Sequence, residues 1–420
     1  MSDTSTNAQA RPWPAPPRVE CLLPREVETE VAILGAGIHG AALARELTLR
    51  GVRCAVMDLG SVGGGTSQWS SQLLHGGIRY LQTGDIGQMK EGLRERAAWA
   101  RIAPSRCRWE AFWMPHRGLW EGFTHRVGIG FYDRWGSDRP GWPESLSLGA
   151  VPDRQFRMDP RAIRTAFRGA VAYADLLTHD RDLVRDLMAS SDALLLDFHE
   201  VMGFEDDGSA LTAIKLRHRL DPGFRTVKAK HFVFALGPWM DGFMAQWFGE
   251  TKNRLRLSSG IHLWFDPSGT PLERCERPWA MMRSKGRILF VIPRDGLIQV
   301  GTTEREVEDG CVPIAESERE DLYDVLGRII PGIAWRELPV AFEELGVRPL
   351  VAASGGTDKL SREAVLETHA RFANLRLVLG GKLTTARALM DRLATELTGK
   401  PCPASLTEPL RVWDGQRGPI

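Results

Sequence analysis

The residues Glu28-Thr29-Glu30-Val31-Ala32-Ile33-Leu34 lead directly into Gly35-Ala36-Gly37-Ile38-His39-Gly40. The first of these segments predicts a short buried strand, and the second has the pattern G-x-G-x-x-G. Small and apolar residues from 41 to 50 predict a helix that ends at Gly51, and residues 53–58 predict a second strand. Strand, glycine turn, helix and strand form a βαβ unit, which indicates an α/β protein that binds a dinucleotide.

Each glycine of the pattern has its own physical role. Gly35 permits a tight turn, Gly37 lets the backbone approach a pyrophosphate, and Gly40 lets helix and strand pack closely. The pyrophosphate would meet the first amides of the helix, at Ile38 and His39, because these amides have no partner inside the helix.

The segment after this unit favours a flavin. Asp58 ends the second strand, where its carboxylate would accept hydrogen bonds from the adenosine ribose of either FAD or a nicotinamide cofactor. Residues 59–81 are then rich in glycine and hydroxyl side chains without helical periodicity, and Arg79 and Tyr80 add a cation and a phenol, which suits a loop lying along a flavin. The residues of this loop expected to contact the cofactor are Thr66, Ser67, Ser70, His75, Gly76 and Gly77.

A second strand, glycine turn and helix follow far along the chain. Residues 375–379 predict a strand, residues 380–385 read Gly-Gly-Lys-Leu-Thr-Thr, and residues 386–398 predict a helix. The N-terminus of such a helix would stabilise negative charge on the reduced flavin ring. We therefore expect FAD to be bound by two segments that are distant in sequence.

Length and composition exclude several classes of protein. The chain has 420 residues, enough for two or three domains, and its 43% hydrophobic and 25% charged residues are typical of globular proteins. A net charge of +1 argues against a protein that coats nucleic acid. The 6 cysteines have no C-x-x-C spacing, so no metal site or disulfide framework is expected and a reducing cytoplasm fits best. No apolar run approaches the roughly 18 residues of a membrane-spanning helix.

Both ends of the chain differ in composition from the rest. Residues 1–25 are rich in proline and lack a basic segment followed by an apolar one, so we expect a disordered arm rather than a signal peptide. Residues 401–420 are expected to form an ordered strap or a frayed end.

A series of sequence blocks follows in one order between about residue 27 and residue 397. Besides the Gly35 pattern, the blocks are residues 65–67 with 74–81, Tyr173 with Asp175, and residues 235–239, 259–262, 290–293, 301–303, 346–350 and 380–385. With these blocks the chain resembles the FAD-dependent glycerol-3-phosphate dehydrogenase family, within the D-amino-acid-oxidase-like flavoproteins. The resemblance implies oxidation of glycerol 3-phosphate to dihydroxyacetone phosphate, as part of glycerol metabolism, by hydride transfer to flavin N5.

The resemblance also implies roles for individual residues. His262 would be the base and Arg348 would polarise the substrate oxygen, while a polar pocket would consist of Arg79, Tyr80, Arg362 and Lys382. Several cations suit a phosphate monoester, which carries nearly two negative charges. Further contacts with the cofactor are implied at Gly237, Trp239, Gly380, Gly381, Lys382, Leu383 and Thr384.

The chain departs from the family pattern at several places, which leaves other substrates open. It reads Ser70-Ser71-Gln72 where Ser-Ser-Lys is usual, and it has Glu304 where Asp is typical. A helical domain that several bacterial members carry after residue 385 is expected to be missing. The alternatives are an oxidase of another anionic polyol, an amine or amino-acid oxidase of the same superfamily, and a flavoprotein that binds a ligand without turnover.

The expected partners are a small phosphorylated substrate and an electron acceptor, either a quinone or oxygen, together with a homodimeric assembly. Trp99, Trp109, Trp113, Trp120, Trp135 and Trp142 lie among many arginines, which is compatible with aromatic packing between helices or with peripheral contact at the inner face of a membrane. Residues 89–103 predict an amphipathic helix that docks on protein.

The predicted architecture is a Rossmann-like FAD-binding domain of the glutathione-reductase type with an antiparallel-sheet substrate domain, both discontinuous in sequence. The FAD-binding domain would comprise residues 26–100, 155–240 and 345–400, and the substrate domain residues 101–154 and 241–344. Alternating segments at 256–265, 287–293 and 297–302 predict antiparallel strands, with Arg294-Asp295-Gly296 as a hairpin turn.

Overall fold

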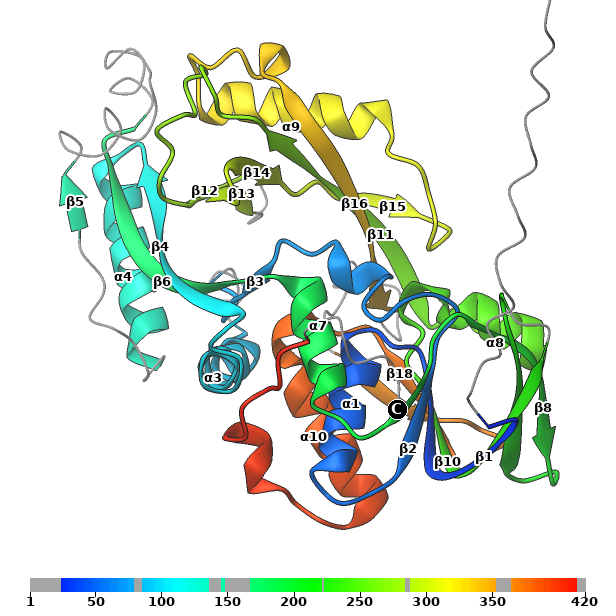
Figure 1. Cartoon of the computed structure of the whole chain (residues 1–420). Coiled ribbons are helices and arrows are strands. Elements are labelled where there is room, and N and C mark those ends of the chain that lie inside the picture. Colours follow the sequence, from blue (N-terminus) through cyan, green and yellow to red (C-terminus); the bar gives the residue numbers. More distant parts are fainter. Residues whose placement is uncertain are drawn as a thin grey trace, which may run out of the picture.

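The computed structural model describes residues 24–78, 85–135, 145–147, 167–220, 223–283, 288–352 and 364–413. Two β-sheets organise these residues, and helices pack against both of them (Figure 1). The predicted fold class, α/β with one largely parallel and one largely antiparallel sheet, is confirmed.

The predicted βαβ unit forms the centre of the first sheet. Strand β1 (Glu26–Leu34) pairs in parallel with β2 (Cys54–Met57) on one side and with β10 (Phe224–Phe234) on the other. Helix α1 (Ile38–Thr48) connects β1 to β2 and begins at Ile38 rather than at residue 41. The last residues of the glycine pattern therefore belong to the first turn of the helix.

The first sheet has the strand order β17-β18-β10-β1-β2-β7, and β8 and β9 continue from β10. Its buried residues alternate between two cores: Val31 and Ile33 face α1 and the other helices on one side, whereas Ala32 and Leu34 face the opposite side. Because both faces are covered, the strand reads as a continuous apolar run. The further elements around this sheet are α7 (Asp180–Ala189), β7 (Leu194–Leu196), β8 (His199–Asp206), β9 (Leu211–His218), α8 (Met240–Phe248), β17 (Val365–Thr368), β18 (Leu375–Leu379) and α10 (Ala386–Thr398).

The second sheet has the order β15-β11-β14-β13-β12-β4-β6-β3, with β16 paired to β11 and β5 to β6. Its strands are β3 (Leu73–Leu74), β4 (Cys107–His116), β5 (Ser145–Ser147), β6 (Gly169–Thr178), β11 (Leu255–Phe265), β12 (Trp279–Met282), β13 (Ile288–Arg294), β14 (Leu297–Gly301), β15 (Arg305–Val307) and β16 (Val340–Val351). Helix α9 (Glu316–Ile329) packs on the face that carries Ile261, Leu263 and Phe265. The even-numbered residues of β11 therefore face the other side.

The predicted hairpin between β13 and β14 is present. Arg294 pairs with Leu297, so Asp295 and Gly296 form a two-residue turn, and both have positive φ angles, 52° and 76°. This geometry matches the twist of the two strands.

The division of the chain into two domains stays a prediction, but the sheets divide the chain differently at two strands. β6 and β16 belong to the second sheet, although most of their residues lie in segments assigned to the FAD-binding domain. All residues of β6 are buried, so its sequence has the continuous apolar character of a parallel strand although it pairs antiparallel with β4.

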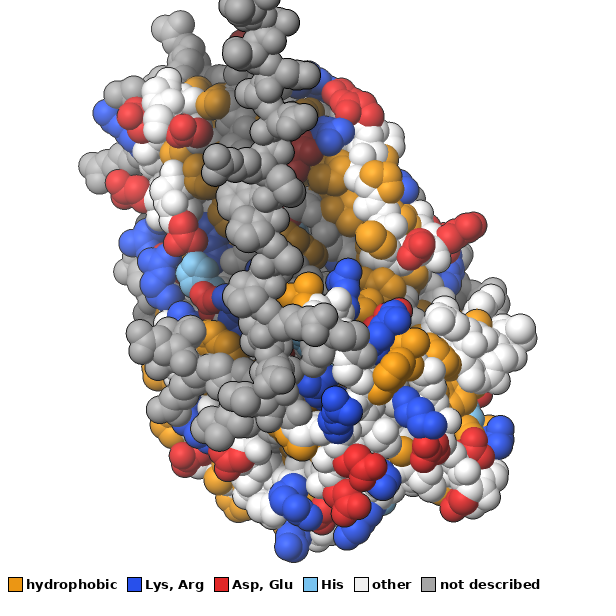
Figure 2. Space-filling model, turned by 45° about the vertical axis from the view of Figure 1, so that its right-hand side comes forward, with side chains coloured by type: hydrophobic (Ala, Val, Ile, Leu, Met, Phe, Trp, Pro, Cys, Tyr) orange, Lys and Arg blue, Asp and Glu red, His pale blue; other side chains and the backbone are white. Residues whose placement is uncertain are grey.

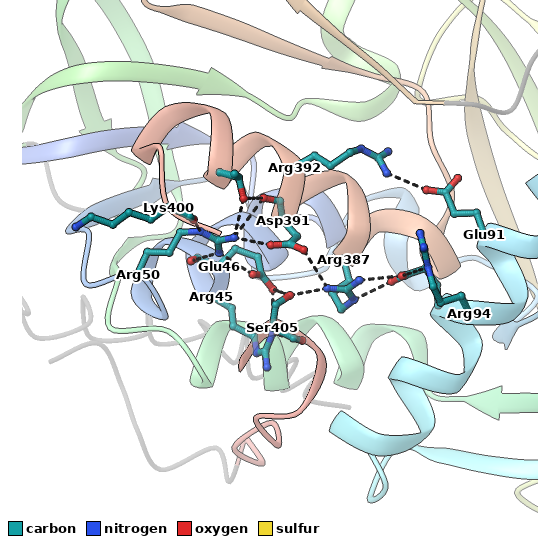
Figure 3. A network of polar contacts seen from close by, with 12 residues as sticks. Arg45, Glu46, Arg50, Glu91, Arg94, Arg387, Asp391, Arg392, Lys400 and Ser405 are labelled. Carbon is teal, nitrogen blue, oxygen red and sulfur yellow. Dashed lines mark hydrogen bonds and ion pairs between the residues drawn. The ribbon is translucent and has the colours of Figure 1, made fainter. Parts of the chain in front are cut away.

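A buried ion network joins α1, α10 and the segment after α10 (Figure 3). Glu46 accepts hydrogen bonds from Arg45 and Arg50 and from Ser405 Oγ, at 2.8–3.0 Å. Arg45 also donates to the carbonyl of Glu408 at 2.6 Å. Of the two expectations for the C-terminal tail, an ordered strap holds for residues 401–413.

The helices around β4 and β6 differ in exposure. Helix α3 (Ile86–Ile102) is the predicted amphipathic helix and buries Met89, Leu93 and Trp99 against protein. Helix α4 (Leu119–Trp135) exposes apolar side chains, including Trp120 at 76% and Phe123 at 56%. None of the described helices has the length and apolar character needed to cross a bilayer.

The charged side chains of the described surface are mixed in sign. On the face shown in Figure 2, Lys and Arg stand among Asp and Glu and form no single basic field over the described residues. This distribution agrees with the near-zero net charge of +1.

Candidate functional site

The glycine pattern lies where β1 ends, beside the end of β10. Gly35 has a φ of 107°, which favours glycine, and a side-chain carbon there would collide with the carbonyl oxygen of Ala235. A side-chain carbon at Gly40 would likewise collide with the backbone of Gly35. The N-cap residue Gly37 has no side chain to offer the helix, and of the first amides of α1 that of Ile38 is bonded to Ser67 Oγ at 3.0 Å.

Asp58 fixes the glycine turn. Its Oδ2 accepts a hydrogen bond from Ala36 N at 2.6 Å, and its Oδ1 accepts one from Gly60 N at 2.7 Å. Burial raises the pKa of this carboxyl, and the two amides partly offset the effect. The contact with a ribose stays a prediction, whereas the tether between β2 and the glycine turn is a role that the sequence did not reveal.

The glycine- and hydroxyl-rich loop connects α1 to the second sheet. Ser67 Oγ accepts a hydrogen bond from Ile38 N at 3.0 Å, and Thr66 Oγ1 donates to the carbonyl of Val347 on β16 at 2.9 Å. Further along, Ser71 Oγ lies 3.2 Å from Nε2 of His262. The loop therefore runs from the expected pyrophosphate site to the expected base.

The next part of this loop is held by a buried polar chain. Gly76 N donates to Tyr132 Oη at 2.9 Å, and Tyr132 donates to Asp175 Oδ1 at 2.8 Å. Arg96 Nη1 lies 2.6 Å from the same carboxylate oxygen. Asp175, which belongs to one of the family blocks, thus holds the loop at Gly76 through the hydroxyl of Tyr132.

The second glycine turn meets the first at His39. Gly380 and Gly381 have φ angles of 66° and 96°, and a side-chain carbon at Gly381 would lie 2.7 Å from His39 Nε2. Burial lowers the pKa of this imidazole to about 4, so it is neutral at physiological pH. Its Nε2 has no hydrogen-bond partner within the described part of the chain.

The segment after this turn lies against the loop and helix α3. Thr384, in the short 3₁₀ helix Leu383–Thr385, accepts from His75 N with Oγ1 at 3.3 Å and from Trp99 Nε1 with its carbonyl at 2.8 Å. Lys382 is half-buried at the start of this 3₁₀ helix. The predicted cofactor residues of the two sequence-distant segments are therefore neighbours.

His262 and Arg348 lie on one face of the second sheet. His262 is on β11 and Arg348 on β16, and the two strands pair antiparallel along most of their length. A side-chain carbon at Gly260 would collide with the guanidinium of Arg348, and one at Gly301 would collide with the imidazole of His262. The two glycines leave room for the two functional side chains.

The imidazole of His262 is neutral and confined. Burial, and then the charge of Arg348, lower its pKa to about 3. Nδ1 is buried and has no hydrogen-bond partner among the residues that the structure describes. Arg348 Nη2 donates to Thr302 Oγ1 at 2.6 Å, which fixes the guanidinium beside the imidazole. A neutral imidazole next to a fixed cation can take a proton from an anionic substrate.

Two buried carboxyl groups lie close to this face. Glu344 is the cross-strand partner of His262 and is 6% exposed, and burial raises its pKa to about 7. Asp180 begins α7 and accepts a hydrogen bond from Ser70 N at 3.0 Å, and burial raises its pKa to about 6. The negative charge of Asp180 raises the pKa of Glu344 further, and the positive charge of Arg294 opposes this.

The structure thus brings together most of the predicted site residues that it describes. Gly237 and Trp239 lie in the 3₁₀ helix Gly237–Trp239, and the ring of Trp239 is 3.0 Å from where a side chain of Gly65 would start. The predicted residues Arg79, Tyr80 and Arg362 lie outside the described residues, as does Trp142.

Sequence reasoning missed Ser71, Glu344, Asp180 and Arg294. Glu344 could have been found, because it precedes Gly346 and Arg348 at strand spacing and must share their face. The other three depend on which strands and loops meet in space. The expected role of Ser70 as a cofactor contact stays a prediction; in the structure its amide is bonded to Asp180 and its Oγ accepts from Gln72 N at 2.9 Å.

Comparison with known proteins assigns the family. The model of the FAD dependent oxidoreductase family (DAO) matches residues 30–388. The chain belongs to this family. FAD is therefore the cofactor, and the glycine cradle at the start of α1 and the unpartnered Nε2 of His39 fit a bound dinucleotide.

Relatives of this FAD-dependent oxidoreductase act on different substrates. An aerobic glycerol-3-phosphate dehydrogenase of Staphylococcus saprophyticus is 28% identical over 372 residues, which are 86% of this chain and 66% of that protein. The structure of glycerol-3-phosphate dehydrogenase from Bacillus halodurans complexed with FAD aligns with a TM-score of 0.68 at 21% identity, over 90% of this chain and 67% of that one. Glycine oxidase from Geobacillus kaustophilus aligns with a TM-score of 0.64 at 18% identity, over 92% and 100%.

Proposed function

We propose that this FAD-dependent oxidoreductase oxidises the secondary alcohol of a phosphorylated polyol to a ketone, with glycerol 3-phosphate as the first candidate. The observation that carries the proposal is the neutral, buried imidazole of His262 beside the fixed guanidinium of Arg348. The names of the staphylococcal relatives and of the Bacillus structure support the choice of substrate.

His262 removes the hydroxyl proton of the substrate in this proposal. The imidazole has a free lone pair at pH 7 because its pKa is low, but a pKa of about 3 also makes it a weak base. A bound phosphate group would offset the charge of Arg348 and raise the pKa of His262 toward the working pH. Arg348 stabilises the negative charge that develops on the substrate oxygen. FAD, when bound, supplies the acceptor for the hydride.

The cofactor would be held by the two glycine turns and the loop between α1 and the second sheet. The amides of Ile38 and His39 would meet the pyrophosphate, Asp58 the ribose, and Gly380, Gly381 and Thr384 the flavin ring. Lys382, with Arg79, Tyr80 and Arg362, would add donors around the phosphate of the substrate. Electrons would leave to a quinone or to oxygen.

An amine or amino-acid oxidase is the second candidate function. Glu344 is the cross-strand partner of His262, and Asp180 bonds the amide of Ser70, next to the residue that contacts His262. A carboxylate suits an ammonium group better than a phosphate. The structural similarity to glycine oxidase agrees with this candidate.

The absorbance of the flavin under anaerobic conditions distinguishes the candidates. We expect glycerol 3-phosphate to bleach the flavin band of the purified protein within seconds, while glycerol, glycine and L-proline leave it oxidised. Bleaching by an amino acid but not by glycerol 3-phosphate would establish the second candidate and overturn the first.

A further inference from the structure

Oxidation of an alcohol releases a proton that must leave a buried site. In the proposed reaction the hydroxyl proton passes to His262 and the hydride to the cofactor, so His262 must give up its proton before the next turnover. The imidazole is only 2% exposed, and bound substrate would cover it further. A route through the protein is therefore needed.

Glu344 is the first group on such a route. It is paired with His262 across β11 and β16 and lies on the same face, where directly opposed side chains are about 4.5–5.5 Å apart at Cβ. Gln299 Nε2 lies 3.5 Å from Glu344 Oε2. In the pairing of β11 with β16, the described residue directly opposite Glu344 is His262.

Arg294 and Asp180 continue from Glu344. Arg294 is 8% exposed and interacts electrostatically with both Glu344 and Asp180, and its Nη1 has no hydrogen-bond partner among the described residues. Gln299 Oε1 is likewise buried and unpartnered in the described part of the chain. Buried polar atoms of this kind are usually satisfied by ordered water, which can bridge the two carboxyl groups.

The line of groups reaches solvent beside His179. Arg294 Nη2 donates to the carbonyl of Thr178 at 3.0 Å and lies 3.4 Å from His179 Nδ1. The side chain of His179 is 49% exposed. Asp295 Oδ2 lies 4.0 Å from His179 Nδ1, and the side chain of Asp295 is 61% exposed. The groups that face the two buried acids thus lead from the imidazole to the surface.

We infer that Glu344 and Asp180, held by Arg294, carry the proton that His262 removes from the substrate out to solvent beside His179. His262 takes the proton at one ring nitrogen and releases one from the other, and the Glu344 carboxylate accepts it. The proton then passes through water to the Asp180 carboxylate and to solvent, so both carboxylates are ionised again and His262 is neutral again, as the opposite tautomer, which must exchange its ring proton before the next cycle. The inference rests on the proposed function for the origin of the proton. The pKa values of about 7 and 6 suit groups that take up and release a proton near neutral pH.

Proton release and flavin bleaching can be followed together. The holoenzyme is mixed anaerobically with glycerol 3-phosphate in weakly buffered solution that contains a pH-indicator dye. In the wild-type protein the proton should appear in step with bleaching. In Glu344→Gln it should lag at least tenfold behind, and Glu344→Asp should restore most of the rate. Release in step with bleaching in Glu344→Gln would overturn the inference.

The neighbouring acid on the same strand provides a matched control. Glu343 lies on the opposite face and pairs with Arg319 at 2.7 Å, so Glu343→Gln should leave proton release in step with bleaching. A lag in both variants would show a general disturbance of β16 and would also contradict the inference.

A second readout needs no substrate and separates this inference from the proposed function. In ¹⁵N-histidine-labelled protein the His262 signal, assigned by its loss in His262→Asn, should shift with an inflection near pH 7 as Glu344 titrates. The inflection should vanish in Glu344→Gln, and its persistence would contradict the route. Failure of glycerol 3-phosphate to bleach the wild-type protein would overturn the proposed substrate and leave this test intact.

Discussion

Two buried polar regions of this molecule differ in how completely their groups are paired. In the network between α1, α10 and the C-terminal strap, Glu46 accepts hydrogen bonds from two arginines and Ser405 (Figure 3). On the face of the second sheet, His262 Nδ1 and Arg294 Nη1 have no hydrogen-bond partner among the described residues.

The difference separates a structural role from a functional one. Charges buried together and fully hydrogen-bonded need nothing else, and their loss is expected to reduce stability. Buried polar atoms without partners cost free energy unless a ligand or water satisfies them. We therefore assign the Glu46 network to holding the fold and the His262 face to chemistry.

The largest expected effect comes from breaking the structural network. Glu46→Gln leaves Arg45 buried without a carboxylate and Arg50 with Asp391 alone, so the free energy of unfolding should fall by roughly 3–5 kcal/mol. Denaturant unfolding at saturating FAD measures this loss. The rate of flavin bleaching per folded molecule should stay at the wild-type value.

An exposed ion pair is the control for this substitution. Glu205 pairs with Lys215 at 2.9 Å on the surface, and Glu205→Gln should change stability far less than Glu46→Gln. Equal losses from both variants would remove the distinction between the two regions.

A smaller effect is expected from filling the space that Gly260 leaves. The added methyl group of Gly260→Ala would collide with the guanidinium of Arg348 and displace it from the substrate. We expect binding of glycerol 3-phosphate to weaken about tenfold or more, which is about 1.4 kcal/mol, with FAD content unchanged. The dependence of bleaching rate on substrate concentration measures this. Gly242→Ala, which meets nothing within 4 Å, should bind as the wild type does.

A further effect concerns the pH dependence of stability. The pKa of Glu344 is raised to about 7 in the folded protein from an ordinary value of 4.5, so its contribution to stability is full below about pH 4.5 and is lost as the pH rises through 7. Glu344→Gln should therefore gain stability relative to the wild type between pH 5 and pH 8. Thermal unfolding of both proteins across this pH range measures the difference. If their unfolding temperatures changed with pH in parallel, the pKa of Glu344 would not be raised.

Local sequence patterns predicted the elements whose signals are self-contained. The bounds of β18 and α10 agree with the predicted 375–379 and 386–398, because an apolar run, a glycine pair and an amphipathic period mark them. The hairpin turn at Asp295 and Gly296 was also predicted from adjacent residues, because Asp-Gly favours the positive φ angles of such a turn.

The features that the sequence could not show depend on which distant segments of the chain pair with one another. β6 reads like a strand of a parallel sheet, yet it pairs with β4 in the second sheet. The alignment of Glu344 with His262 is set by the register of β11 and β16, which no local pattern specifies. Asp58 was predicted for its position but not for its bond to Ala36 N.

His262→Asn shows whether the incompletely paired face around His262 performs the chemistry. The variant and the wild type are mixed anaerobically with glycerol 3-phosphate, and the rate of flavin bleaching at saturating substrate is compared. Loss of the base predicts a rate lower by roughly 10²–10⁴-fold, with unchanged FAD content and no loss of stability above pH 7. A rate equal to that of the wild type would show that this face does not perform the chemistry.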